Sequence, residues 1–363
     1  MTPSTGPRAR VLVVDDSAFA RKVLRETLTA SPDVDVVGIA RDGLEALEKI
    51  AELLPDVITL DLMMPNLDGI GVLRELIATH SNALVILVSS SDRDSEVVVE
   101  ALTLGAFDVV KKPTALATDV LYELSSELVR KVLAAAESRA AKARLMSGGT
   151  PVPLGLPRPY TPPGEVELVV IGTSTGGPNA LTRVLTALPA NFNLPIAIAL
   201  HIPADYTLAL ARRLDHDSAI QVVEAGAVDT ILRPGVAVLA RGGAHMRIER
   251  RGTILVARTT SEPGNADYFP SVDLLFESAA KASRHRTLGV VLTGMGNDGL
   301  RGSREIVEHG GCVITESETS CVVYGMPRCV AEAGLSAVSR PLDGIAAELV
   351  TRTASARSTT VAE

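Results

Sequence analysis

The stretch at residues 166–181 constrains the fold more than any other part of this 363-residue chain. Residues 168–171 are apolar and β-branched enough for one buried strand, and several glycines crowd the turn that follows around Ser174. A helical pattern then runs over residues 179–188. A strand, a glycine-rich turn and a helix in succession predict that Ser174 lies at the carboxyl end of a strand. In an open parallel sheet, ligands bind at that edge.

Three roles are open to this turn on the residues alone. Gly172, Gly176 and Gly177 let the backbone approach a ligand closely and free amide N–H groups to face it, as in a phosphate-binding loop. The same geometry can present Ser174 as a nucleophile beside amides that bind an oxyanion. The turn can also be purely structural. The Walker sequence and the dinucleotide glycine spacing are both absent, which makes cofactor binding less favoured, but the turn alone does not decide among the three roles.

Length and composition narrow the class of protein. A chain of 363 residues suits two domains, and its hydrophobic content of 46% supports substantial cores. The net charge of −8 argues against nucleic acid as an obligatory partner. Cys312, Cys321 and Cys329 lack zinc-ligand spacing, which predicts reduced thiols in a cytosolic protein. No apolar run approaches 18 residues, so we expect a cytoplasmic protein without direct membrane insertion.

The first module alternates strands and helices, which predicts a doubly wound parallel α/β sheet. Apolar, β-branched runs predict the strands, and apolar residues at helical spacing predict the helices between them. Strands are expected at 10–16, 34–39, 57–61, 84–89 and 109–112, and helices at 17–28, 42–53, 69–79, 94–104 and 118–135.

Acidic side chains follow two of these strands. Asp15 and Asp16 end the first strand and Asp61 ends the third, so all three should converge at the carboxyl edge of the sheet. Clustered carboxylates repel one another unless a hard cation neutralises them, and Mg²⁺ prefers oxygen ligands of this kind. Ser89 and Lys112 end two further strands within reach of the same pocket. The pattern therefore predicts a cation site at this edge.

This constellation resembles the receiver domain of two-component response regulators, over about residues 8–126. The motifs that carry the resemblance are VVDDS at 13–17, LDLMMPNLDG at 60–69, LVSS at 87–90 and KKP at 111–113. The resemblance implies that Asp61 accepts a phosphoryl group from a histidine kinase. It also implies that Asp16, Asp61 and the Met63 carbonyl bind Mg²⁺, with Asp15 acting through water.

The same resemblance assigns two phosphoryl-sensing residues. Ser89 would donate a hydrogen bond to the phosphoryl oxygens, and Lys112 would pair with their charge. One position departs from the pattern, because Val109 stands three residues before the lysine, where receivers usually have an aromatic side chain. An aromatic rotamer switch is therefore not expected in this chain.

The two modules are expected to be joined by a linker. Residues 127–164 should comprise a helix extension with a basic face and then a Pro/Gly-rich segment that sustains neither a helix nor an inner strand. Residues 351–363 form a polar tail that we expect to be disordered.

The second module, residues 165–350, again alternates strands and helices, with a mixed or antiparallel part expected at 219–259. Ser174, His201 and Asp298 each follow an apolar strand, so a parallel sheet could gather them on one edge. A serine hydroxyl needs a base within hydrogen-bond reach, and a carboxylate behind an imidazole fixes its tautomer. His245, which follows two glycines, is the main rival for the base.

Five motifs in this module resemble the chemotaxis receptor methylesterases, the CheB family. They are GTSTGGP at 172–178, HIP at 201–203, PSVDLLF at 270–276, LTGMGNDG at 292–299 and VYGMP at 323–327. The resemblance implies Ser174 as nucleophile, His201 as general base and acid, and Asp298 as the carboxylate that orients it. Met295 would lend a backbone amide to the oxyanion hole.

The resemblance also implies a substrate and a form of control. The substrate would be the γ-glutamyl methyl ester of methyl-accepting chemoreceptors, with deamidation of receptor glutamines at the same site and no cofactor for ester hydrolysis. The unphosphorylated receiver would restrict access to Ser174. Leu200 and the run at 240–243 depart from the family pattern without removing a catalytic group. The alternative is a response regulator whose second module only binds a protein or a phosphorylated ligand.

Overall fold

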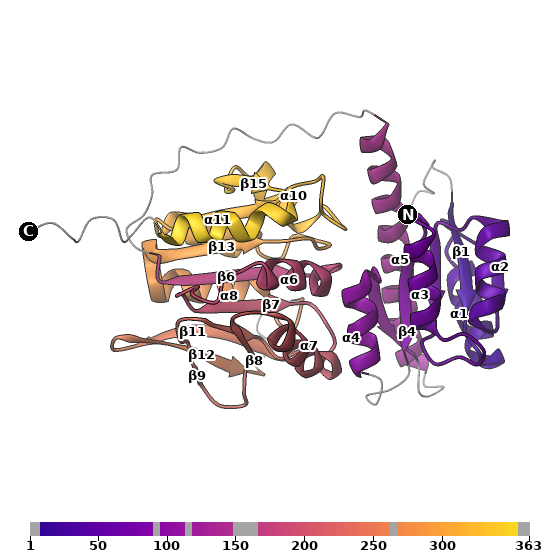
Figure 1. Ribbon diagram of the computed structural model, residues 1–363, viewed down its shortest axis with the longest axis horizontal. Helices are drawn as coiled ribbons and strands as arrows, with labels where there is room; N and C mark the ends of the chain where they lie inside the picture. Colours follow the sequence, from indigo (N-terminus) through magenta and orange to yellow (C-terminus); the bar gives the residue numbers. More distant parts are fainter. Residues whose placement is uncertain (1–7, 90–94, 113–117, 148–165, 262–266, 355–363) are drawn as a thin grey trace, which may run out of the picture. The chain divides into compact units, whose positions relative to one another are not determined.

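The computed structural model describes residues 8–89, 95–112, 118–147, 166–261 and 267–354 (Figure 1). The chain divides into two compact units, residues 1–150 and 151–363, and each is described here by itself.

The first unit contains a five-stranded sheet in the order β2-β1-β3-β4-β5. All four neighbouring pairs are parallel, which confirms the predicted doubly wound sheet. The strands are β1 (Ala9–Val14), β2 (Val34–Ala40), β3 (Val57–Leu60), β4 (Leu84–Ser89) and β5 (Asp108–Lys111). The helices are α1 (Ala18–Thr29), α2 (Gly43–Leu53), α3 (Gly69–Ala78), α4 (Ser95–Leu104) and α5 (Thr118–Met146).

Polar side chains cap the N-termini of three of these helices. Ser17, Asp42 and Asp68 accept backbone N–H groups in the first turns of α1, α2 and α3. Helix α5 continues well beyond residue 135, over the stretch expected to extend it. Asp94, the expected first residue of α4, lies outside the described residues, as does the predicted linker from residue 148 onward.

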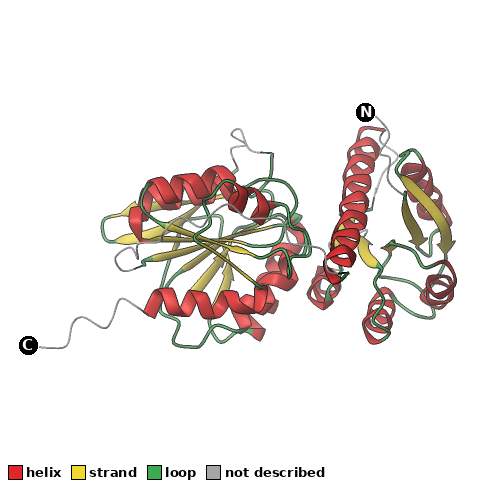
Figure 2. Cartoon of the chain, turned by 90° about the horizontal axis from the view of Figure 1, so that it is seen from above, coloured by secondary structure: helices red, strands yellow, loops and turns green. Residues whose placement is uncertain are grey.

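The second unit contains a seven-stranded sheet in the order β15-β14-β13-β6-β7-β10-β8, with every pair parallel. Figure 2 shows its helices on both faces of this sheet. The strands are β6 (Leu168–Thr173), β7 (Ile196–Leu200), β8 (Gln221–Glu224), β10 (Val236–Leu239), β13 (Thr287–Val291), β14 (Cys312–Glu316) and β15 (Val338–Arg340). The helices are α6 (Gly177–Thr186), α7 (Ala204–Asp217), α8 (Val272–Ser283), α9 (Leu300–Glu308), α10 (Met326–Glu332) and α11 (Leu342–Ala354).

A smaller antiparallel sheet accompanies it, in the order β11-β12-β9. Its strands are β9 (Thr230–Ile231), β11 (His245–Arg251) and β12 (Ile254–Thr260). The region at 219–259 was expected to be mixed or antiparallel, and it divides between the two sheets. The hairpin of β11 and β12 is antiparallel, whereas β10 pairs in parallel with β7 and β8 pairs in parallel with β10.

Strand β6 lies in the middle of the seven-stranded sheet. It is buried along its whole length, between β13 on one side and β7 on the other. Figure 1 shows the three strands side by side. In register, Gly172 is paired with Val291 of β13, and Thr173 is paired with Leu200 of β7. The carboxyl ends of all three strands therefore meet where Ser174 begins its turn.

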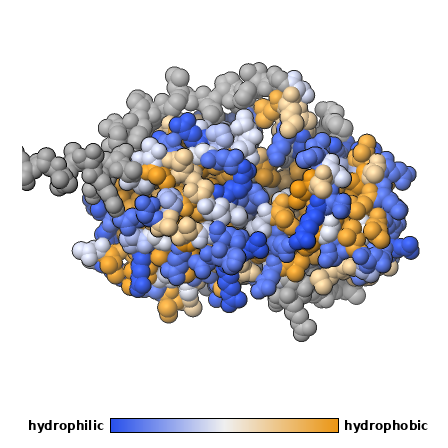
Figure 3. All heavy atoms as spheres, in the orientation of Figure 1, coloured by the Kyte–Doolittle hydropathy of each residue, from blue (hydrophilic) through white to orange (hydrophobic). Residues whose placement is uncertain are grey.

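The face of the molecule drawn in Figure 3 carries mixed hydrophilic and hydrophobic side chains, with apolar patches on each unit. Within the described part of the chain, no helix combines the length and the apolar character that crossing a membrane requires. Helix α11 continues to Ala354, four residues past the expected end of the module at residue 350. An i,i+4 ion pair between Glu348 and Arg352 supports this last turn, and residues 355–363 of the expected tail lie outside the described residues.

Candidate active site

Ser174 follows β6 directly and is held by its own backbone. Its N–H donates to the Thr293 carbonyl at 3.0 Å, and its carbonyl accepts the Gly177 N–H at 2.7 Å. Gly176 has a φ of +78°, a conformation that favours glycine and lets the chain turn into α6. A Cβ at Gly294 would lie 2.8 Å from the Ser174 Cβ, so the neighbouring loop packs directly against the serine.

His201 follows β7 and faces Asp298. Its ring Nε2 lies 2.8 Å from the Asp298 Oδ2. Its backbone N–H donates to the Thr173 carbonyl at 3.2 Å. The ring of Tyr268 stacks on the imidazole, with 4.3 Å between centroids and 4° between planes. Among the described residues, Nδ1 of His201 is buried without a hydrogen-bond partner. It is thus the nitrogen left to exchange a proton with a neighbour.

Asp298 is a buried carboxylate with four hydrogen-bond donors. Besides His201, they are the N–H of Val272 at 2.7 Å, the N–H of Asp273 at 2.8 Å and the Ser271 hydroxyl at 3.1 Å. Burial alone disfavours its charge, but the hydrogen bond and charge of His201 and the two amides outweigh burial. They hold the pKa of Asp298 below its ordinary value, so the carboxylate is ionised at neutral pH.

Of the predicted triad, the structure brings His201 and Asp298 into contact and puts Ser174 on the adjacent strand end. Because Thr173 is paired with Leu200, Ser174 and His201 are the next residues along neighbouring strands. No hydrogen bond joins their side chains in the described residues. Such a bond is often absent in enzymes without substrate and forms in the substrate complex.

His245, the rival base, has a different environment. Its Nδ1 accepts the N–H of Ser271 at 3.2 Å, and its ring stacks on Phe269 with centroids 4.4 Å apart. The side chain is fully buried at the start of β11. His245 therefore supports the loop that caps α8, and the geometry favours His201 as the base.

The loop after β13 carries Met295, the predicted oxyanion residue. In the part of the chain that the structure describes, the Met295 N–H has no hydrogen-bond acceptor. The flanking Gly294 is fixed instead, since its N–H donates to Val323 and its carbonyl accepts the Met326 N–H. An amide that remains available to donate, next to a residue held by two backbone hydrogen bonds, suits an oxyanion hole.

Sequence reasoning missed three residues that shape this site. Tyr268 stacks on His201, but the residues around it show neither helical nor strand periodicity that would have pointed to it. Thr293 lies inside a quoted motif, and its hydroxyl donates to the Thr175 carbonyl at 3.0 Å and accepts the Val323 N–H at 2.9 Å. The buried Glu316 accepts the Thr293 N–H at 2.8 Å. Burial raises the pKa of Glu316 against the opposing hydrogen bonds of its neighbours.

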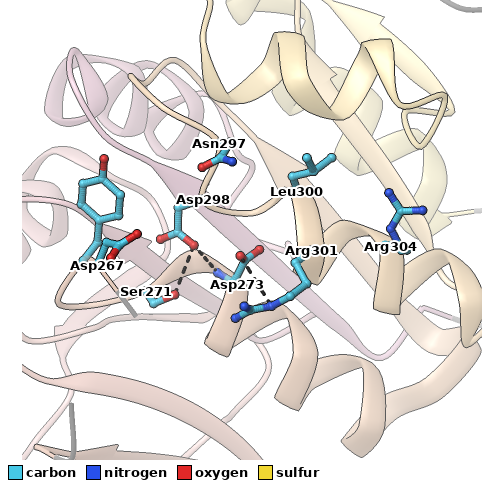
Figure 4. Close-up of a pocket in the computed structure, with 9 residues that line it drawn as sticks. Asp267, Ser271, Asp273, Asn297, Asp298, Leu300, Arg301 and Arg304 are labelled. Atoms are coloured by element: carbon cyan, nitrogen blue, oxygen red, sulfur yellow. Dashed lines mark hydrogen bonds and ion pairs between the residues drawn. The ribbon is translucent and has the colours of Figure 1, made fainter. Parts of the chain in front are cut away.

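A cavity of about 360 Å³ opens beside Asp298 (Figure 4). It is lined by the loops before α8 and α9 and by the first turns of both helices. Asp267 and Arg304 are two charged residues at its wall, and Asp298 and Ser271 are hydrogen-bonded within it. Asp298 thus lies at the wall of a cavity lined mainly by polar side chains.

In the first unit, the predicted acidic cluster is present. Ligand oxygens of Asp15, Asp16 and Asp61 lie within 4.8 Å of one another, so the cluster could hold a metal ion. The Lys112 Nζ lies 2.8 Å from both Asp15 Oδ2 and Asp61 Oδ2. Burial raises the pKa of Asp61 despite the opposing hydrogen bond and charge of Lys112.

The remaining predicted receiver residues surround this cluster. Among the described residues, the Ser89 hydroxyl is buried without a partner, and the Lys112 N–H donates to the Ser89 carbonyl. Met63 is largely exposed. Three carboxylates beside an unpartnered hydroxyl suit a hard cation and an anionic group.

Comparisons with known proteins agree with both units. The family model described as CheB methylesterase matches residues 169–349, and the response regulator receiver domain model matches residues 11–121. Protein-glutamate methylesterase/protein-glutamine glutaminase 5 of Myxococcus xanthus is 55% identical, covering 94% of this chain and 97% of its own length. The enzyme of the same name from Moorella thermoacetica is 41% identical, again covering 94% of this chain and 97% of its own length.

A solved structure supports the second unit. The crystal structure of the Thermotoga maritima CheB methylesterase catalytic domain matches with a TM-score of 0.50 and 35% identity, covering 52% of this chain and 98% of that chain. The relatives at 55% and 41% identity span nearly the whole chain, including both family-model regions. This chain therefore belongs to the CheB methylesterase family and carries a response regulator receiver domain before the methylesterase domain.

Proposed function

We propose that this protein is a receptor methylesterase that hydrolyses γ-glutamyl methyl esters of chemoreceptors and releases methanol. The observation that carries the proposal is the 2.8 Å contact between His201 and Asp298 beside the Ser174 turn, in a chain of this family. Receptor glutamines are proposed as further substrates, since the relatives are also named as glutaminases.

The proposed reaction proceeds through an acyl-enzyme. His201 Nδ1 takes the proton of the Ser174 hydroxyl while Oγ attacks the ester carbonyl, and the Met295 N–H donates to the oxyanion. Asp298 stabilises the imidazolium, which then protonates the departing methoxide to methanol. Water, activated by His201, next attacks the acyl-enzyme and releases glutamate and free Ser174. With a glutamine substrate the leaving group is ammonia.

The receiver is proposed to control this activity through Asp61. Its carboxylate oxygen would form a bond to phosphorus while the bond to the kinase histidine breaks. Asp16, Asp61 and the Met63 carbonyl would hold Mg²⁺ with Asp15 acting through water, and the bound ion would offset negative charge. Lys112 would pair with the phosphoryl group, and Ser89 would donate a hydrogen bond to it. The buried, unpartnered Ser89 hydroxyl supports this role.

The organisation of the chain follows the same proposal. Residues 8–126 would form the receiver domain, 127–164 the helix extension and linker, 165–350 the methylesterase domain and 351–363 the tail. The protein would act in the cytoplasm on receptors, with neither nucleic acid nor direct membrane insertion involved.

Two measurements test the activity. Methanol release from methylated receptor membranes should require Ser174, so Ser174→Ala should abolish it while the far-ultraviolet circular dichroism spectrum stays unchanged. A fluorophosphonate should form a covalent bond to Ser174 Oγ with loss of fluoride. A well-folded protein that neither releases methanol nor reacts with the reagent would instead be a regulator whose second module only binds its partner.

A further inference from the structure

Two carboxylates cap each other's helices beside the triad. Asp298 precedes α9, yet it accepts the N–H groups of Val272 and Asp273 in the first turn of α8. Asp273 belongs to α8, yet its Oδ1 accepts the Gly299 N–H at 2.9 Å and the Gly302 N–H at 2.7 Å at the start of α9. Figure 4 shows Asp273 and Asp298 adjacent, with dashed lines from Asp298 to Ser271 and Asp273.

These reciprocal hydrogen bonds hold the start of α9, and with it the preceding Asp298, against α8. Helix α9 begins at a glycine cap with no side chain of its own to accept its first amides, so Asp273 supplies the acceptor from α8. The helices also touch closely, because a Cβ at Gly302 would lie 2.9 Å from the Asp273 carbonyl oxygen. Without Asp273, the first turn of α9 and the preceding Asp298 would lose this anchor.

The charges around Asp273 bear on the triad as well. Burial and the nearby Asp298 charge raise the pKa of Asp273, against hydrogen bonds from Gly302 and Gly299 and the charge of Arg301. The Arg301 Nε lies 3.8 Å from Asp273 Oδ2 and is also paired with Glu277. An ionised Asp273 therefore adds negative potential near the Asp298–His201 pair.

We propose that Asp273 is a positioning residue that orients the Asp298 carboxylate toward His201 by capping α9. The inference rests on the proposed methylesterase function. It assigns a role to the aspartate of the PSVDLLF motif, which neither the acyl-enzyme chemistry nor the receiver uses.

The geometry offers two informative variants. Both amides of α9 donate to the same oxygen, so Asp273→Asn can keep both hydrogen bonds and remove only the charge. Asp273→Ala removes the acceptor itself. We expect Asp273→Ala to lower kcat about 10- to 100-fold with little change in KM, since small displacements of catalytic groups cost this much. Asp273→Asn should restore most of kcat, because the amide oxygen can still accept both N–H groups.

The experiment uses the full-length protein on a methylated receptor peptide, with circular dichroism and thermal unfolding to measure the folded fraction. Asp215→Ala is the matched control, because Asp215 accepts the Val222 N–H at 2.7 Å in the same unit without contacting the triad. It should lose stability without losing kcat per folded molecule.

Three results would overturn the inference. They are full kcat in folded Asp273→Ala, a loss of activity that only follows the folded fraction as in the control, and an Asp273→Asn variant as slow as Asp273→Ala. These differ from a failure of the proposed function, in which the unmodified protein itself would neither release methanol nor react with a fluorophosphonate.

Discussion

Replacing Asp298 with asparagine tests how the proposed triad carboxylate acts. Its Oδ2 accepts from His201 and the Val272 N–H, whereas its Oδ1 accepts from the Asp273 N–H and the Ser271 hydroxyl. The hydroxyl can rotate and accept from an NH₂ group, whereas His201 could accept from one only by changing its tautomer. The amide oxygen of Asp298→Asn should therefore take the Oδ2 position and keep the His201 tautomer.

The expected loss follows from the missing charge. An imidazolium and a carboxylate with charge centres about 4 Å apart attract by about 4 kcal/mol at an effective dielectric constant of about 20. The amide oxygen retains a neutral hydrogen bond worth about 1 kcal/mol. A net loss of about 3 kcal/mol corresponds to a decrease in kcat/KM of about 10²-fold. A wrong tautomer would instead cost about 10⁴-fold in kcat.

Methanol release from a methylated peptide measures the loss, with Asp267→Asn as the control. Asp267 lines the same cavity, and in the described structure it has no contact with His201, so its replacement should change kcat/KM less than about twofold. A decrease of less than fivefold for Asp298→Asn would refute the charge argument. A decrease near 10⁴-fold would refute the predicted amide orientation.

The same substitution has a pH signature in stability. Because the folded-state pKa of Asp298 lies below 3.8, its ionised form contributes stability above that pH, and this is lost as the pH falls through the folded-state value. The difference in unfolding free energy between the parent and Asp298→Asn should narrow below about pH 4. A difference that stays constant down to pH 2 would contradict the assignment.

Three further predictions concern other contacts. Gly294→Ala should lower the rate of fluorophosphonate labelling without unfolding the protein, because its Cβ would lie 2.8 Å from that of Ser174. Tyr268→Ala should lower kcat/KM by about 2- to 10-fold through loss of the ring stacked on His201, whereas Tyr268→Phe should be nearly unchanged. Asp61→Asn should block Mg²⁺-dependent labelling by acetyl phosphate, and the label on the unmodified protein should be labile to hydroxylamine. Full labelling of Asp61→Asn would identify another acceptor.

Local patterns predicted much of the fold. Apart from the end of α5, strand and helix bounds in the first unit agree within a few residues, and the acid-tipped strands meet as expected, because side-chain period and strand-end position are local properties. The placement of β8 and β10 was not predictable from short apolar runs. The strand that pairs with a parallel strand is determined by tertiary packing between segments distant in the sequence. The pairing of Asp298 with α8 joins residues about 26 positions apart, and no spacing rule predicts it.

Three helix N-termini gather at this catalytic edge, and their caps differ. The first turn of α8 is capped by the Ser271 side chain and also donates N–H groups to Asp298. At the start of α9, the N–H groups donate to Asp273 of α8. Helix α6, which starts just after Ser174, has no side-chain cap hydrogen bond. Amides at a helix N-terminus favour negative charge, so the first two helices stabilise the carboxylates of Asp298 and Asp273. The third directs its positive end toward the serine turn, where the oxyanion would form. This arrangement explains how adjacent acidic groups are held beside the proposed nucleophile, whose reaction would also create negative charge.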